Sequence, residues 1–162
     1  MEEKYSDIIK KQSKTLINKL SEKGYKISFA ESVTGGLLVS SLTKVSGASK
    51  VLDMSYVVYS NNAKMNVLGV SEQTIKNHSV YSEQVVREML LGLKNKTSAE
   101  VLIAVSGIAG PLGFDNHEVG ETYIGIMVGN NVEINKKVFS GSREIVQYKI
   151  TEFTFSKIIE KL

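Results

Sequence analysis

The sequence predicts an α/β fold, specifically a three-layer α/β/α sandwich with a mixed sheet. The run Val101–Val105 is apolar throughout, which is typical of a strand buried on both faces of a sheet. Amphipathic helical patterns come before and after this run, so we expect helices to cover both faces. The β-rich segments 122–128 and 132–139 add an antiparallel pair. At 162 residues, the chain has the length of one domain, and we expect residues 1–162 to form it.

Helical and strand patterns alternate through the first half of the chain. Apolar residues at helical spacing begin after Lys4, and Gly24 is a typical residue just beyond a helix C-terminus. Either Ser60 or Asn61 is the expected N-cap of a later helix. The expected elements are a helix over 4–22, a strand over 26–30, a helix over 35–44, a strand over 54–59 and a helix over 61–68.

The second half has clearer start and stop signals. Ser71 and Ser82 are typical N-caps, each followed by a short amphipathic run. Gly129-Asn130-Asn131 indicates the turn of a β-hairpin. The expected elements are helices over 71–77 and 82–93, a strand over 101–105, paired strands over 122–128 and 132–139, and a helix over 143–162.

Composition excludes several classes of protein. The sequence contains no cysteine, so disulfides, thiolate nucleophiles and cysteine metal sites are excluded. The net charge of +3 is too small to indicate binding to nucleic acid or to a membrane surface. No apolar run approaches the ~20 residues that span a bilayer, and the polar start Met1–Lys4 shows no signal peptide. We therefore expect a cytoplasmic protein that contacts neither nucleic acid nor membrane.

Loops that follow strands are the expected place for a ligand in this fold. The first such loop holds Ser32, Thr34, Gly35 and Gly36 directly before a helix. Two interpretations stay open. Either Ser32 or Thr34 caps the helix, or the Ser32 hydroxyl is exposed beside free backbone N–H groups that stabilise an oxyanion or bind a phosphate. The two glycines would let a ligand approach the backbone closely.

The second loop, 59–64, places Lys64 one turn inside a helix that starts after Tyr59. A lysine can be the base that activates a serine, provided that burial or a nearby cation lowers its pKa. Tyr59 would then relay the proton or hold the lysine. The alternative is a solvated surface lysine beside a tyrosine at the edge of the core.

The third loop, 106–111, contains small residues after the buried strand, so either it leaves room for a ligand or it forms a tight turn. Arg143 begins the last helix and is either part of an anion pocket or an exposed side chain. His78 and His117 are far apart in sequence, and their spacing supports neither a metal site nor a Ser-His-Asp triad. We interpret both as ordinary structural or surface histidines.

Taken together, these segments resemble the CinA C-terminal domain family. The resemblance runs from about residue 11 to residue 162, and its motifs come in the family's order. The segments that carry it are Ala30-Glu31-Ser32-Val33-Thr34-Gly35-Gly36, Tyr59-Ser60-Asn61-Asn62-Ala63-Lys64, Leu68-Gly69-Val70 and Ser106-Gly107-Ile108-Ala109-Gly110-Pro111. The large N-terminal domain of full-length family members is not in this sequence, so the chain resembles the stand-alone form.

The resemblance implies an amidohydrolase that converts nicotinamide mononucleotide to nicotinate mononucleotide and ammonia. Ser32 would be the nucleophile, Lys64 the base, and Tyr59 a proton relay or hydrogen-bond partner. Backbone N–H groups near Gly35 and Gly36, or around Gly107, would bind the amide oxygen. The substrate-binding residues would be Thr34, Gly35, Gly36, Ser106, Gly107, Ala109 and Arg143. No cofactor or metal is implied, the partner is the small nucleotide substrate, and we expect a homodimer or higher homo-oligomer.

The chain departs from the family's motifs in several loops. Val33 stands where a smaller residue usually follows the serine, and the family's Asp before the final Arg is replaced by Ser142. The stretch written H-G-A-V-S in the family is here His78-Ser79-Val80-Tyr81-Ser82, and the K-P-V-G-T segment is replaced within 112–122. These changes motivate an alternative function, a catalytically impaired nucleotide-binding domain or a competence-associated accessory domain of the same fold.

Overall fold

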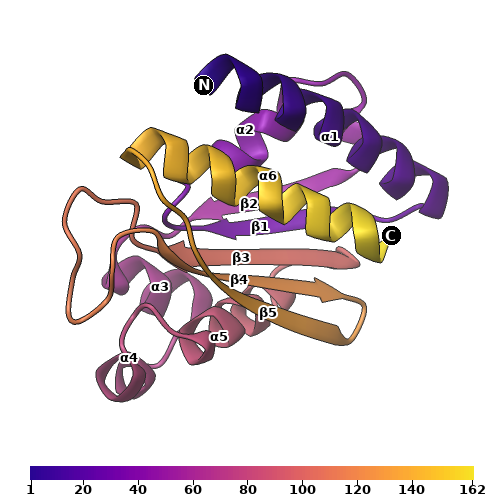
Figure 1. Ribbon diagram of the computed structural model, residues 1–162. Coiled ribbons are helices and arrows are strands. Elements are labelled where there is room, and N and C mark those ends of the chain that lie inside the picture. The colour runs from indigo at the N-terminus through magenta and orange to yellow at the C-terminus, as the bar shows by residue number, and fades with distance from the viewer.

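The computed structural model describes residues 1–162 and confirms the predicted α/β architecture. A five-stranded sheet runs through the centre in the order β2-β1-β3-β4-β5 (Figure 1). β1 pairs in parallel with β2 and β3, whereas β4 is antiparallel to both β3 and β5. The strands are β1 (Ile27–Glu31), β2 (Leu52–Val57), β3 (Val101–Gly107), β4 (Glu121–Val128) and β5 (Asn131–Val138).

Helices cover the sheet on both faces, as Figure 1 shows: α1, α2 and α6 lie on one face, and α3, α4 and α5 on the other. The helices are α1 (Glu2–Lys23), α2 (Leu37–Thr43), α3 (Asn61–Leu68), α4 (Glu72–His78), α5 (Glu83–Lys94) and α6 (Arg143–Lys161), with a short 3-10 turn, η1 (Ala48–Lys50). None of these helices is long and apolar enough to span a membrane.

Two hydrophobic cores lie on opposite sides of the sheet, and β3 contributes to both of them. Ile103 and Val105 pack into the core under α1 and α6, whereas Leu102 and Ala104 pack into the core under α5. Successive side chains of a strand point to opposite faces. The fully apolar run in the sequence is therefore the central strand, as predicted.

Most element boundaries fall close to the predicted ones, and the exceptions have local causes. α2 begins at Leu37 and not at residue 35, because Gly35 and Gly36 have φ values of 60° and 100° and form a left-handed turn before the helix. β2 ends at Val57, so Tyr59 lies beyond the strand. The predicted N-caps Ser71 and Ser82 are confirmed, and Ser60 rather than Asn61 caps α3.

The parallel strands determine where the loops meet. Because β1, β2 and β3 run in the same direction, the loops that follow Glu31, Val57 and Gly107 lie at the same edge of the sheet. The three loops singled out in the sequence are these three, and they surround a cavity at this edge.

Candidate active site

The cavity at the carboxyl ends of β1–β3 has a volume of about 370 Å³. It is the size of a small-ligand site. Its walls come from the three strand-end loops, the segment before α5 and the start of α6. The lining residues are Ser32, Val33, Tyr59, Asn61, Lys64, Val80, Tyr81, Gly107, Ile108, Ala109, Gly110, Leu112, Gly113, Phe114 and Arg143.

Lys64 and Ser32 both line this cavity and are in contact. The Nζ atom of Lys64 lies 3.0 Å from the Oγ atom of Ser32 and 3.2 Å from the carbonyl oxygen of Tyr59. The lysine is only 2% exposed, although its helix lies at the surface. Burial lowers the pKa of Lys64 from 10.5 to about 8, and the lysine forms no ion pair that would counter this effect. The arrangement therefore provides a hydroxyl with a nitrogen base beside it.

Local backbone contacts place Ser32 at this point. Its N–H donates to the carbonyl oxygen of Val105 at 3.1 Å, which extends the β1–β3 pairing by one residue. Its own carbonyl oxygen accepts the N–H of Gly35 at 3.0 Å, so the chain turns immediately after the serine. The side chain is 7% exposed and lines the cavity.

Glu31, the residue before the serine, is the helix cap that sequence reasoning missed. Its buried carboxylate accepts the backbone N–H groups of Gly36, Leu38 and Val39 at distances of 2.9–3.1 Å. Neither Ser32 nor Thr34 caps α2, which corrects that prediction; the Thr34 hydroxyl instead donates to Glu31 at 2.7 Å. Burial raises the pKa of Glu31 although these hydrogen bonds oppose the shift.

The same contacts change the expected oxyanion donors. The N–H of Gly35 is bonded to Ser32 and that of Gly36 to Glu31, so neither is free for a substrate. The N–H groups of Val33 and Thr34 donate to no protein acceptor, and they follow Ser32 directly in the chain. The N–H groups of Ala109 and Gly110 in the third loop also donate to no protein acceptor, so Val33 and these two residues carry free donors in the cavity lining.

The other predicted substrate-binding residues divide into two sets. Gly107, Ala109 and Arg143 line the cavity, and Arg143 also donates to the carbonyl oxygen of Gly110. The remaining predicted residues lie outside it. Thr34, Gly35 and Gly36 border a separate hollow next to α6, and the buried Ser106 hydroxyl donates to the carbonyl oxygen of Val80 at 3.2 Å.

Aromatic side chains, which sequence reasoning did not single out apart from Tyr59, form part of the cavity wall. The ring centroids of Tyr81 and Phe114 are 6.2 Å apart in an edge-to-face arrangement. Tyr59 is 62% exposed, and it contacts Lys64 through its carbonyl oxygen. Burial, and secondarily the Tyr59 phenol, raise the pKa of Tyr81. The phenols of Tyr59 and Tyr81 therefore line the same cavity as Lys64 and Arg143. No carboxylate lines this cavity.

The family model of the CinA C-terminal domain matches residues 9–162. The chain belongs to this family. It is 40% identical over 144 residues to a nicotinamide-nucleotide amidohydrolase PncC of Enterobacter agglomerans, and the match covers 88% of each protein. It is also 38% identical to a CinA-like protein of Petrotoga mobilis over 155 residues, which are 95% of this chain and 36% of that protein.

Solved structures of the CinA family share the fold. The structure of a competence damage-inducible protein A from Klebsiella pneumoniae superposes with a TM-score of 0.92 at 30% identity, covering 94% of this chain and 96% of that one. A competence or damage-inducible protein from Enterobacter asburiae gives the same TM-score at 31% identity, covering 94% and 97%. The chain spans about a third of the length of several longer CinA relatives, because the match covers 31% to 36% of those proteins.

Proposed function

We propose that this CinA-family chain is a nicotinamide-nucleotide amidase that hydrolyses the carboxamide of nicotinamide mononucleotide. The observation that carries the proposal is the 3.0 Å contact between the amine of Lys64 and the hydroxyl of Ser32. A lysine with a pKa near 10.4 is neutral in about one molecule in 2,500 at pH 7. With a pKa of about 8, roughly one Lys64 in ten is neutral at that pH.

Acylation begins when neutral Lys64 accepts the proton of Ser32 as the Oγ atom attacks the carboxamide carbon. The oxygen of the tetrahedral intermediate becomes negative, and the free N–H group of Val33, which lines the cavity directly after Ser32, is the donor closest in sequence to stabilise it. The intermediate collapses by breaking the C–N bond. The Lys64 ammonium returns its proton to the leaving nitrogen, so ammonia departs and an ester of Ser32 remains.

Deacylation repeats these steps with water in place of the serine. Lys64, again neutral, takes a proton from the attacking water, and the C–O bond to Ser32 breaks as the serine regains its proton. The product is a carboxylate, nicotinate mononucleotide. Both half-reactions use the same amine as base and acid, so no other titratable side chain is required at the reacting atoms.

The cavity lining is suited to the two ends of this substrate. The nucleotide phosphate is an anion, and the Arg143 guanidinium at the start of α6 lies at the cavity without a carboxylate in the lining. The pyridinium ring of the substrate is cationic and flat, which favours contact with the rings of Tyr81 and Phe114. We further propose that Tyr59 acts mainly through its carbonyl oxygen, which orients Lys64.

The proposal is tested by measuring ammonia release from nicotinamide mononucleotide. Ser32→Ala and Lys64→Met should each lower kcat at least 100-fold, whereas Ser6→Ala, which alters an exposed serine on α1, should retain the wild-type rate. Circular dichroism of each variant checks folding. Equal rates for wild type and Ser32→Ala would refute the role of Ser32.

The segment 112–122, in which the K-P-V-G-T motif of the family is replaced, favours one competing function, binding of the nucleotide without turnover. Saturable binding measured by calorimetry, with no ammonia from the wild-type protein, would establish that alternative. The homo-oligomeric state and the cytoplasmic location belong to the proposal as well. Analytical ultracentrifugation tests the first.

A further inference from the structure

Ser79, which follows the last residue of α4, has a backbone conformation that residues other than glycine rarely adopt. Its φ and ψ angles are 71° and 155°. This region is essentially restricted to glycine, and other residues there carry strain of about 1–3 kcal/mol. Strain of this kind concentrates at functional sites, where surrounding contacts hold the residue in place.

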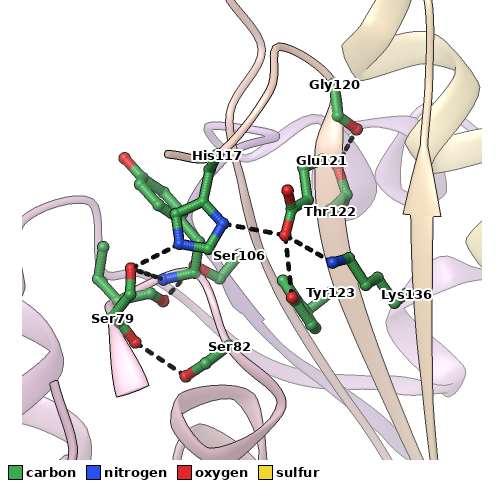
Figure 2. A network of polar contacts seen from close by, with 11 residues as sticks. Ser79, Ser82, Ser106, His117, Gly120, Glu121, Thr122, Tyr123 and Lys136 are labelled. Carbon is green, nitrogen blue, oxygen red and sulfur yellow. Dashed lines mark hydrogen bonds and ion pairs between the residues drawn. The ribbon is translucent and has the colours of Figure 1, made fainter. Parts of the chain in front are cut away.

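The contacts that hold Ser79 form a chain of three side chains (Figure 2). The Nε2 atom of His117 lies 3.0 Å from the Oγ atom of Ser79, and its Nδ1 atom lies 2.9 Å from Oε1 of Glu121. A carboxylate only accepts, so Nδ1 carries the proton, and Nε2 of the neutral ring is an acceptor. The Ser79 oxygen already accepts the N–H of Tyr81 at 3.3 Å, which leaves its own proton directed to His117.

Glu121 is fixed as the orienting group of this chain. Its side chain is 7% exposed, and the same oxygen also contacts Lys136 at 3.0 Å and the hydroxyl of Tyr123 at 2.9 Å, as Figure 2 shows. Burial raises the pKa of Glu121, but the hydrogen bonds from His117, Lys136 and Tyr123 outweigh it and lower the pKa to about 2. The carboxylate is therefore ionised at neutral pH and keeps the imidazole in one tautomer.

We propose that Ser79, His117 and Glu121 form a second nucleophilic site, distinct from Ser32, that takes small acyl esters. His117 accepts the Ser79 proton as Oγ forms a bond to the acyl carbon, and it gives this proton to the leaving oxygen, so that a neutral alcohol departs when the ester C–O bond breaks. Water then attacks the acyl-serine by the same route, which releases the carboxylic acid and restores Ser79. The proposed amidase reaction assigns no role to these side chains.

The surroundings of Ser79 are suited to this reaction. The N–H of Val80 donates to no protein acceptor, and the N–H of the residue after a nucleophile is a common oxyanion donor. A hollow of about 390 Å³ is bordered by residues that contact this chain of side chains: Tyr123 and Lys136, which contact Glu121, and Tyr81, whose N–H donates to Ser79. Tyr81 also lines the Ser32 cavity, so the two sites share one wall.

A serine-directed fluorophosphonate probe tests the proposal in the Ser32→Ala protein, where the first site has no nucleophile. The Ser79 oxygen would bond to phosphorus, fluoride would leave, and the serine proton would pass to His117. Peptide mass spectrometry should find the adduct on Ser79. The labelling rate should fall at least 100-fold in Ser32→Ala/His117→Gln.

Two further variants separate chemistry from folding. Ser79→Gly in the same background removes the hydroxyl at a backbone position that glycine tolerates, so it should fold at least as well as its parent and take no label. Ser6→Ala, also in the Ser32→Ala background, should be labelled on Ser79 at the rate of its parent. Absence of an adduct on Ser79 in the folded Ser32→Ala protein, or unchanged labelling in the His117→Gln variant, would overturn the proposal. Both results are independent of ammonia release, so they leave the amidase proposal to its own test.

Discussion

Replacing Lys64 by methionine should abolish activity and stabilise the protein at the same time. The buried amine is 2% exposed, and its pKa is lowered from 10.5 to about 8 by burial. Below pH 8, the folded protein must therefore carry a buried charge that is fully solvated in the unfolded chain. Methionine has a similar length and no charge, so it removes this penalty.

The magnitude follows from the shift. A lowering of the pKa from 10.5 to about 8 corresponds to about 3 kcal/mol of unfolding free energy lost at low pH. The substitution also removes the hydrogen bonds to Ser32 and Tyr59, which are worth about 1 kcal/mol together or somewhat more. A net gain of about 1–2 kcal/mol at pH 6 would raise the Tm by roughly 2–8 °C in a chain of this size.

The pH dependence provides the sharper assay. Between pH 8 and pH 10.5, the unfolded chain binds more protons at this residue than the folded one, so wild-type stability rises and the penalty disappears. Urea unfolding of both proteins from pH 6 to pH 10.5 measures the difference, and the other lysines cancel in it. The advantage of Lys64→Met should vanish or reverse above pH 10. A difference that is the same at every pH would refute the assignment of a desolvated lysine.

Three further outcomes follow from other contacts. Arg143→Gln should raise KM for nicotinamide mononucleotide about tenfold or more with a smaller effect on kcat, because the guanidinium lines the cavity and would bind the phosphate of the substrate, not its carboxamide; steady-state kinetics measures both values. Glu31→Gln should lower the unfolding free energy by about 1–3 kcal/mol in urea melts, because an amide offers one acceptor oxygen where two oxygens of the carboxylate cap α2. Gly92→Ala should destabilise the protein strongly, since the new Cβ would lie 1.9 Å from the carbonyl oxygen of Leu68. In the control variant Gly24→Ala, the new Cβ meets nothing within 4 Å, and the positive φ should cost about 1 kcal/mol. A larger loss of Tm in Gly24→Ala than in Gly92→Ala would contradict this prediction.

The fold could be predicted from the sequence because the hydrophobic pattern of each segment agrees with the helix or strand that it forms. A strand that faces two cores must be apolar throughout, and β3 is the strand that meets this condition. The N-caps of the helices were visible because a serine three residues before a free N–H is a local signal, as at Ser71 and Ser82. The start of α2 was predicted two residues early because Gly35–Gly36, a pair typical of a turn, was included in the helix.

The site was predictable only where topology forces residues together. Ser32 and Lys64 follow parallel strands, so their proximity could be expected from strand order, and the structure places them in contact. The capping role of Glu31 was missed because its sequence position does not distinguish it from any other charged residue near the end of a strand. Only the structure shows that its carboxylate accepts N–H groups at the start of the following helix. His117 was interpreted as an ordinary histidine because its partner Ser79 is 38 residues away and comes close only through tertiary packing.

Two serine hydroxyls at this end of the molecule thus lie 3.0 Å from a side-chain nitrogen, and the two proposed bases have opposite electrostatic requirements. A lysine becomes a base only if no carboxylate stabilises its ammonium form, and Lys64 has none in its cavity. A histidine needs an acceptor on its far nitrogen to hold the correct tautomer, and Glu121 is that acceptor for His117. A carboxylate in the first site should therefore oppose the neutral form of Lys64, so Asn61→Asp, in the wall of that cavity, should raise the pKa of Lys64 and shift the pH–rate profile of ammonia release to higher pH. An unchanged profile would show that Lys64 does not act as a base.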